Sequence, residues 1–296
     1  MLGSIRSEGS EMAVPPVVMP PHHTDTPGSR NQVEPDGRKI PVLGVGISPA
    51  NLPEVVVSLD NWRQSAQQGY VCCVSVHGIV TAQRDQAVRA ALNGASLATK
   101  DGMPMAWWCR RSGDADSTRV CGSDVFDAVC RYGIERGYRH YFYGGSQAVL
   151  DSLVERLPHL YPGIVIAGYR SPPFRALTPD EDAADIDAIN QADSDFVWVG
   201  LGMPKQEKWI AAHFGKVRAT ALLGVGAVFD FYAGTKPRAP VWMQQAGLEW
   251  SFRLCSEPRR LARRYLIDNS IFVGLTLRHV LLRAASRAVA TSATRS

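Results

Sequence analysis

Two hydrophobic patterns alternate along residues 52–225. Short apolar runs such as 196–199 predict buried strands, and segments with an apolar residue at every third or fourth position predict helices. Strands that alternate with helices favour an α/β fold with a mainly parallel, Rossmann-like sheet that carries helices on both faces. We expect strands at 70–76, 96–99, 141–143, 164–167, 196–199 and 219–225, and helices at 52–66, 81–93, 104–108, 124–136, 147–160, 179–191 and from 204 onward. Ser123 or Asp124 can cap the helix at 124–136.

Three regions of different composition divide the chain. Residues 1–38 are rich in Pro, Ser, Gly and charged residues without apolar periodicity, so we expect a disordered N-terminal tail. Residues 39–247 contain the α/β pattern. From Pro240 onward the pattern is that of consecutive helices, and we interpret residues 248–296 as an arginine-rich helical C-terminal appendage.

Nothing in the sequence predicts export or a membrane span. No basic start is followed by an apolar run of signal-peptide length, and no apolar stretch reaches about 18 residues. The six cysteines lack CxxC spacing and histidine partners at zinc spacing. We therefore expect a cytoplasmic protein with reduced thiols.

Charge is distributed unevenly. Residues 251–296 contain nine arginines and two acidic residues, a balance of +7, so a net charge of +4 leaves −3 for the rest of the chain. Aromatic and aliphatic residues alternate with arginines at helical spacing there, which suits the surface of an anionic bilayer. A helix docked on the domain with a solvated arginine face explains the pattern equally well. Nucleic acid is not expected, because no nucleic-acid-binding motif accompanies the charge.

Polar residues follow several of the predicted strands, at the edge where α/β sheets bind ligands. Asp101 comes directly after a strand and is a candidate general base for a hydroxyl nucleophile. The alternative is that Asp101-Gly102 is an ordinary turn. Ser75 and His77 are expected to end the preceding strand and to point to the same side, although a histidine in such a place is more often structural.

Two glycine-containing turns follow the strands at 141–143 and 196–199. Backbone N–H groups and the positive end of a helix dipole face the ligand at such turns, which suits a diphosphate. An ordinary strand-to-helix connection is the alternative. The candidate nucleotide or diphosphate contacts are Gly144, Gly145, Ser146, Gly202, Pro204, Lys205, Gln206 and Glu207.

The sequence lacks the motifs that bind several classes of ligand. Neither glycine turn is a full GxGxxG and no GxxxxGK[ST] run exists, which argues against a dinucleotide cofactor and a P-loop. Asp114 and Asp116 have a spacing that could hold a metal, but their Ser/Gly/Asp-rich surroundings are typical of a surface loop. We expect no cofactor and no bound metal.

Eight segments in order and at consistent spacing resemble the WecG/TagA/CpsF family of bacterial glycosyltransferases. The resemblance covers about residues 40–280. The segments are Asp101-Gly102, RVCGSD at 119–124, YFYGG at 141–145, VGLGMPKQEKW at 199–209, GVGAVFDFYAG at 224–234, RAP at 238–240, LEWSFRL at 248–254 and EPRRLARRY at 257–265.

The resemblance implies an inverting, metal-independent transfer of an N-acetylmannosamine-type sugar. The donor would be a UDP-sugar, and the acceptor a polyprenyl-diphosphate-linked sugar at the cytoplasmic face of the membrane. It also implies that Asp101 is the base and that the appendage closes the site and touches the membrane. On this basis we expect Ser75, His77 and Arg119 on the acceptor side, and Arg253, Arg260, Arg263 and Arg264 in contact with membrane or phosphate.

One position departs from the family pattern. The strand before the aspartate usually carries Thr-x-Asn, whereas this chain has Ser75, Val76 and His77. Serine keeps a hydroxyl, but histidine for asparagine changes donor geometry and charge. The contacts to the acceptor, or the choice of sugar, are therefore expected to differ.

The leading hypothesis is thus a glycosyltransferase that makes a lipid-linked precursor of a surface or exported polysaccharide, bound peripherally to the membrane. Two alternatives stay open at this stage. One is a nucleotide-cofactor oxidoreductase on a doubly wound sheet, and the other is a non-catalytic module that binds a membrane surface. A homo-oligomer is compatible with the sequence, which does not identify the sugar or the acceptor.

Overall fold

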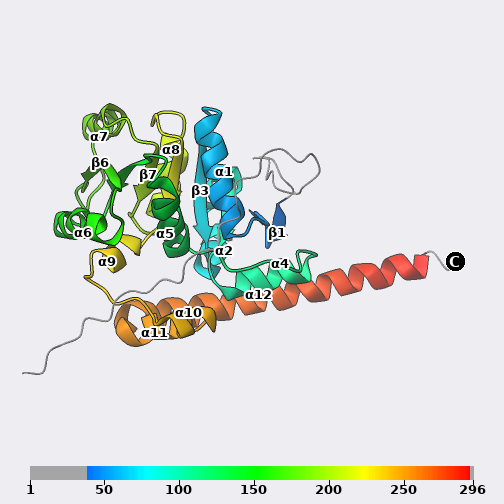
Figure 1. The fold of residues 1–296 in the computed structure, drawn as a ribbon. Coiled ribbons are helices and arrows are strands. Elements are labelled where there is room, and N and C mark those ends of the chain that lie inside the picture. The colour runs from blue at the N-terminus through cyan, green and yellow to red at the C-terminus, as the bar shows by residue number, and fades with distance from the viewer. Residues whose placement is uncertain (1–38, 294–296) are drawn as a thin grey trace, which may run out of the picture.

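A six-stranded parallel sheet forms the centre of the protein (Figure 1). The computed structural model describes residues 39–293 and, of residues 245, 260, 264 and 283–293, the backbone only. The strand order is β4-β3-β8-β7-β5-β6, and each neighbouring pair is parallel. The prediction of a parallel α/β sheet is confirmed. The strands are β3 (Gly69–Val74), β4 (Leu97–Lys100), β5 (Arg139–Tyr143), β6 (Val165–Arg170), β7 (Phe196–Val199) and β8 (Ala221–Gly224), and a separate hairpin consists of β1 (Ile40–Val42) and β2 (Val45–Ile47).

Helices pack on both faces of the sheet, as the continuous apolar strands predict. One hydrophobic core is formed with α1 (Leu52–Gln64), α5 (Gly122–Gly133), α6 (Gln147–Leu160) and α9 (Val228–Tyr232). The core on the opposite face is formed with α2 (Val76–Ala82), α3 (Gln86–Gly94), α4 (Met103–Arg111), α7 (Pro179–Gln191) and α8 (Lys205–His213).

Strand β7 shows how one short apolar run serves both cores. Successive side chains of a strand point to opposite faces, so Phe196 and Trp198 enter the first core while Val197 and Val199 enter the second. The first core contains an aromatic cluster around Phe126, whose ring centroid lies 4.8 Å from that of Trp198. This buried strand holds the glycine turn that follows it at the edge of the sheet.

Three further helices close the chain: α10 (Val241–Gln245), α11 (Glu249–Ser256) and α12 (Pro258–Ala293). Figure 1 shows α12 as one long helix that passes α2 and α4, and α2 and α12 are in contact. Within residues 39–293, none of the helices combines the length and the apolar character needed to cross a bilayer.

The predicted boundaries of one strand, 70–76, and of one helix, 81–93, were wrong. Strand β3 ends at Val74, and Ser75 is the N-cap of α2, so His77 lies in the first helical turn and not on a strand. The carbonyl of Ser75 accepts a hydrogen bond from the Ile79 N–H, which begins the helix two residues after the strand. The predicted helix 81–93 is divided in two because Asp85 caps α3, its carboxylate accepting from two backbone N–H groups.

The predicted cap of α5 was also wrong. Cys121 is the N-cap, and Ser123 and Asp124 lie inside the first turn. The Asp124 carboxylate binds Arg119 and Arg238 and so is not used as a cap. The predicted tail, residues 1–38, lies outside the described residues.

The aromatic cluster should contribute strongly to stability. Phe126 is fully buried, so we expect Phe126→Ala to lower the free energy of unfolding by about 3–5 kcal/mol through lost burial and a cavity. Phe174 is 83% exposed, and Phe174→Ala should change the free energy by less than about 0.5 kcal/mol. Urea denaturation of both variants checks this, and equal effects would contradict the proposed packing role.

Candidate active site

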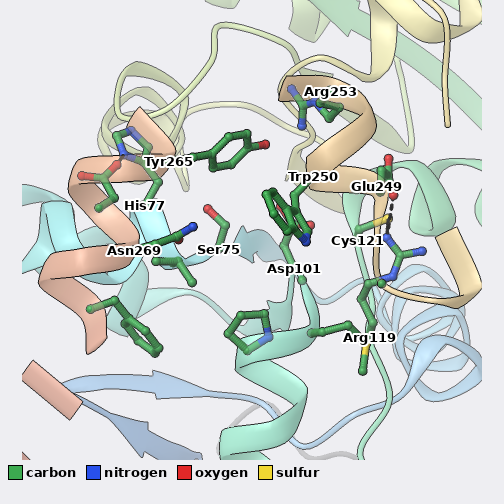
Figure 2. Close-up of a pocket in the computed structure, with 18 of the residues that line it drawn as sticks. Ser75, His77, Asp101, Arg119, Cys121, Glu249, Trp250, Arg253, Tyr265 and Asn269 are labelled. Carbon is green, nitrogen blue, oxygen red and sulfur yellow. Dashed lines mark hydrogen bonds and ion pairs between the residues drawn. The ribbon is translucent and has the colours of Figure 1, made fainter. Parts of the chain in front are cut away.

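A cavity of about 640 Å³ opens at the carboxyl edge of the sheet (Figure 2). Its walls come from the ends of β3, β4 and β8, the start of α5, and the C-terminal helices α11 and α12. Five of the predicted site residues line it: Ser75, His77, Asp101, Arg119 and Arg253. These residues span 178 positions of sequence (253 − 75), and the fold brings them to one place.

The end of β4 places Asp101 in this cavity. Lys100, the last strand residue, is fully buried and donates hydrogen bonds from Nζ to the Pro49 carbonyl and the Asn51 side chain. The Asp101 N–H donates to the Val74 carbonyl at 3.0 Å, which fixes the backbone against β3. Gly102 then adopts a φ of +101°, a value that strongly favours glycine, and α4 starts at the next residue.

The electrostatic environment of Asp101 suits a base. Burial is the largest cause that raises the pKa of its carboxyl to about 6, and the nearby Glu249 carboxylate adds to the effect. Arg119 and Arg253 act in the opposite direction. A carboxylate with this pKa is ionised at neutral pH, yet it is a stronger base than an ordinary aspartate.

Four charged side chains form a ring beside Asp101. Arg119 binds Glu249 at 2.8 Å and Asp124 at 3.1 Å. Arg238 binds Asp124 at 2.6 Å, and its Nε lies 4.0 Å from Glu249. We call these four residues the ion-pair ring. Since Glu249 belongs to α11 and Asp124 to α5, the ring joins the C-terminal helices to the α/β body. Figure 2 shows the contact between Arg119 and Glu249.

A second polar contact joins α12 to the body. His77 Nδ1 lies 2.6 Å from the Asp268 carboxylate, and both side chains are largely buried. His77 stands where the resemblance given above implies asparagine, and it pairs with a residue of α12. Ser75 lies on the same wall, between His77 and Asp101 in Figure 2.

The N-termini of four helices border the cavity. The N-cap residues are Ser75 of α2, Gly102 of α4, Cys121 of α5 and Ala227 of α9, and none forms a side-chain capping hydrogen bond. The first N–H groups of a helix have no partner within the helix, and its dipole is positive at that end. The cavity is therefore suited to an anion.

The glycine turn at 144–146 does not line this cavity. Ser146 caps α6 by accepting from the Val149 N–H. A Cβ on Gly145 would approach Phe229, whose neighbour Val228 does line the cavity. This turn therefore lies next to the cavity, across α9.

The turn at 202–207 also lies outside the cavity lining. Lys205 and Gln206 stand in the first turn of α8 as predicted, but Pro204 is the N-cap. The buried Gln206 accepts from the Gly202 N–H and donates to Glu207, so it braces the turn from within. Lys205 is exposed.

The predicted arginines of the appendage have different environments. Arg253 lines the cavity, with its guanidinium 5.7 Å from the ring centroid of Phe231. Arg263 is exposed on α12. The side chains of Arg260 and Arg264 lie outside the described part of the structure.

Several cavity residues were not singled out as site residues from the sequence. Glu249 and Trp250 lie within the LEWSFRL segment, so the family resemblance held a signal for them that spacing alone does not. Trp107 and Trp108 lie within the predicted helix 104–108, to which the sequence analysis gave no role in the site. Other residues of this group are Arg111, Tyr265, Asp268 and Phe272.

The aspartates of the loop at 114–116 do not belong to this site. Asp114 lies 3.8 Å from the buried Lys100 ammonium group, and Asp116 is exposed. Among the residues that the structure describes, no three His, Cys, Asp or Glu side chains are grouped so as to hold a metal ion.

Two named proteins are similar to this chain over most of its length. A protein from Staphylococcus aureus named N-acetylglucosaminyldiphosphoundecaprenol N-acetyl-beta-D-mannosaminyltransferase is 24% identical over 227 residues, which cover 76% of this chain and 87% of the relative. A Bacillus spizizenii protein of the same name is 29% identical over 198 residues, 67% of this chain and 74% of the relative.

The model of one enzyme family also matches most of the chain, over residues 40–286. This range contains both the sheet and the helices that complete the cavity. The match favours the glycosyltransferase hypothesis over the oxidoreductase and the non-catalytic module. The chain belongs to the glycosyl transferase WecG/TagA/CpsF family.

Proposed function

We propose that this enzyme transfers an N-acetylmannosamine-type sugar from a UDP-sugar to a polyprenyl-diphosphate-linked sugar, with inversion and without a metal ion. The observation that carries the proposal is the position of Asp101 in a cavity bordered by helix N-termini and arginines. The names of the two relatives support the choice of sugar and acceptor, because both describe an N-acetylmannosaminyltransferase that acts on a diphosphoundecaprenol-linked sugar.

In the proposed reaction Asp101 accepts the proton of the acceptor hydroxyl. The hydroxyl oxygen forms a bond to the anomeric carbon of the donor while the bond from that carbon to the UDP oxygen breaks on the opposite face. The configuration inverts because a single displacement occurs. UDP leaves with the electron pair of the broken bond, and the proton remains on Asp101 until it passes to solvent.

The negative charge that develops on the UDP diphosphate requires fixed partners. The N-termini of α4 and α5 present N–H groups without side-chain caps at the cavity, and Arg119 and Arg253 line it. These groups support a reaction that uses protein dipoles and guanidinium groups in place of a metal. The turns at 144–146 and 202–207 remain our prediction for contacts to the nucleotide.

We further propose that the enzyme works at the inner face of the cytoplasmic membrane through α12. This helix exposes Leu266, Leu277 and Leu281 together with Arg259 and Arg263. Apolar side chains beside arginines suit an anionic lipid surface, where the acceptor is anchored.

The role of Asp101 as the base is tested by measuring UDP release by the purified protein. The reaction mixtures contain one of a panel of UDP-N-acetylhexosamines, a short-chain polyprenyl-diphosphate sugar as acceptor, and EDTA. We expect release that needs the acceptor and survives EDTA. Asp101→Asn should lower turnover on the order of 10²-fold or more, because the amide cannot accept the proton. The control Asp116→Asn makes the same change in an exposed loop and should keep full activity. Full activity in Asp101→Asn would remove Asp101 as the base.

The pH dependence of kcat/KM tests the environment of this base. Below a pKa of about 6 the Asp101 carboxyl is protonated and cannot accept a proton, so kcat/KM should fall as the pH falls through about 6. Glu249→Gln removes a negative charge that raises this pKa, so the midpoint should move to lower pH. Glu181→Gln, in the first turn of α7 and outside the cavity lining, is the control and should leave the midpoint in place. An unmoved midpoint in Glu249→Gln would contradict the electrostatic role of Glu249.

Membrane contact through α12 is tested by sedimentation with vesicles that contain anionic lipid. Arg263→Glu changes the charge by two units at about 1 kcal/mol each, so partitioning should weaken about 30-fold at low salt. Arg218→Glu makes the same change at an exposed residue near the amino end of β8, at the opposite edge of the sheet, and should have a much smaller effect. Equal losses in the two variants would show attraction by net charge alone and would exclude a specific α12 contact.

A further inference from the structure

On one side, the active-site cavity extends between α4 and α12. The walls of this groove are formed by Pro104, Trp107 and Trp108 of α4 and by Phe272, Val273 and Thr276 of α12. Positions three and four apart share one face of a helix, so each helix presents a continuous stripe to the groove. We call these six residues the α4–α12 groove.

The floor of the groove is rigid and apolar. The rings of Trp108 and Phe272 lie 6.3 Å apart, and Phe272 is 8% exposed. The Trp108 indole N–H donates a hydrogen bond to the Pro41 carbonyl, which fixes the ring against β1. The His77 and Asp268 contact holds α12 against α2 one turn before Phe272.

The rims of the groove are apolar but open. Trp107 is 55% exposed and Val273 is 54% exposed, although both line the cavity. Apolar side chains in this arrangement gain free energy when an apolar ligand removes them from water. A chain lying in the groove would cover both.

The two ends of the groove identify the ligand. Its inner end, at Pro104, lies three residues after Asp101, where the acceptor hydroxyl must react. Beyond its outer end α12 continues with the exposed side chains of Leu277, Val280 and Leu281. A ligand that fits has a sugar at one end and a long apolar chain at the other, and that chain passes from the cavity to an apolar surface.

We propose that the α4–α12 groove binds the first isoprene units of the acceptor's polyprenyl chain. This inference rests on the proposed function, because it assumes a lipid-linked acceptor. It adds a binding site for the lipid itself, separate from attachment of α12 to a membrane. The stripe on α4 from Pro104 to Trp108 is about 6 Å long, enough for the start of the chain only.

The test compares two acceptors in the absence of membranes, GlcNAc-diphosphate-farnesyl and GlcNAc-diphosphate-methyl. We expect kcat/KM of the full-length enzyme to be about 100-fold higher for the farnesyl acceptor. In Trp107→Ala and in Val273→Gln this ratio should fall to about tenfold or less. Both side chains are more than half exposed, so the variants should fold, which a thermal melt checks.

The matched control is Trp242→Ala. Trp242 is 62% exposed on α10 and does not line the cavity, so its loss should leave the farnesyl-to-methyl ratio as in the unchanged enzyme. A ratio near one in the unchanged enzyme, or one that Trp107→Ala and Val273→Gln do not alter, would overturn the groove and leave the transferase function standing. A chain-length effect that appears only with vesicles would assign the lipid to the membrane surface and also overturn it.

Calorimetric binding of the same two acceptors separates this inference from the reaction. If no sugar is transferred but the farnesyl compound binds more tightly than the methyl compound, and Trp107→Ala abolishes the difference, the groove stands and the proposed donor or reaction fails. Equal binding of the two compounds would reject the groove. If the unchanged enzyme forms a dimer, and Val273→Gln abolishes both the dimer and the binding of the farnesyl compound, this face would instead be assigned to a second copy of the chain.

Discussion

The ion-pair ring is the interaction on which the rest of the active site depends. Arg238 is almost completely buried, and Arg119, Asp124 and Glu249 keep only 15–20% of their side-chain surface exposed. Charges at such depth are costly unless each faces an opposite charge. In a ring of two arginines and two carboxylates every charge has opposite charges for neighbours. The arrangement is stable only when α11 lies against α5, so the ring requires the C-terminal helices to be docked on the body.

Docking of these helices also determines the chemistry of Asp101. Glu249 raises the pKa of the Asp101 carboxyl, and Arg253, four residues later on the same helix, lowers it. Helix α11 thus places one negative and one positive side chain near the carboxylate of Asp101. Burial is the largest contribution and decides the sign of the shift. The result is a carboxylate that is ionised at neutral pH and remains a better proton acceptor than an exposed aspartate.

The sheet and most helices could be predicted from the sequence because their signals are local. The run at 196–199 and the glycine after it are enough to give β7 and its turn. The predicted ends of helices and strands were wrong where a polar side chain had competing partners. Asp124 was expected to cap α5, but two arginines bind its carboxylate. Ser75 and His77 were expected on a strand, yet a helix begins there.

The candidate site was predicted in part, for a related reason. Asp101 follows a strand, so topology alone brings it to the ligand edge. The contacts that complete the cavity join residues far apart in sequence: Arg119 and Glu249 are 130 positions apart, and His77 and Asp268 are 191 apart. No periodicity links such positions. Periodicity and charge predicted a basic, helical appendage, but only the family resemblance marked the LEWSFRL segment, and it did not give the contacts of that segment.

The order of the cavity residues along the chain has a consequence for biosynthesis. The cavity begins with Ser75 and ends with Thr276, so its last wall is supplied by a helix that is made after the whole sheet. The sheet is complete at Gly224, about fifty residues earlier. A nascent chain can therefore fold its sheet while the base still lacks Glu249, Arg253 and the wall of α12. The cavity is complete only once the residues up to Thr276 have been made, and a chain that stops before them, although folded in part, carries an open and incomplete site.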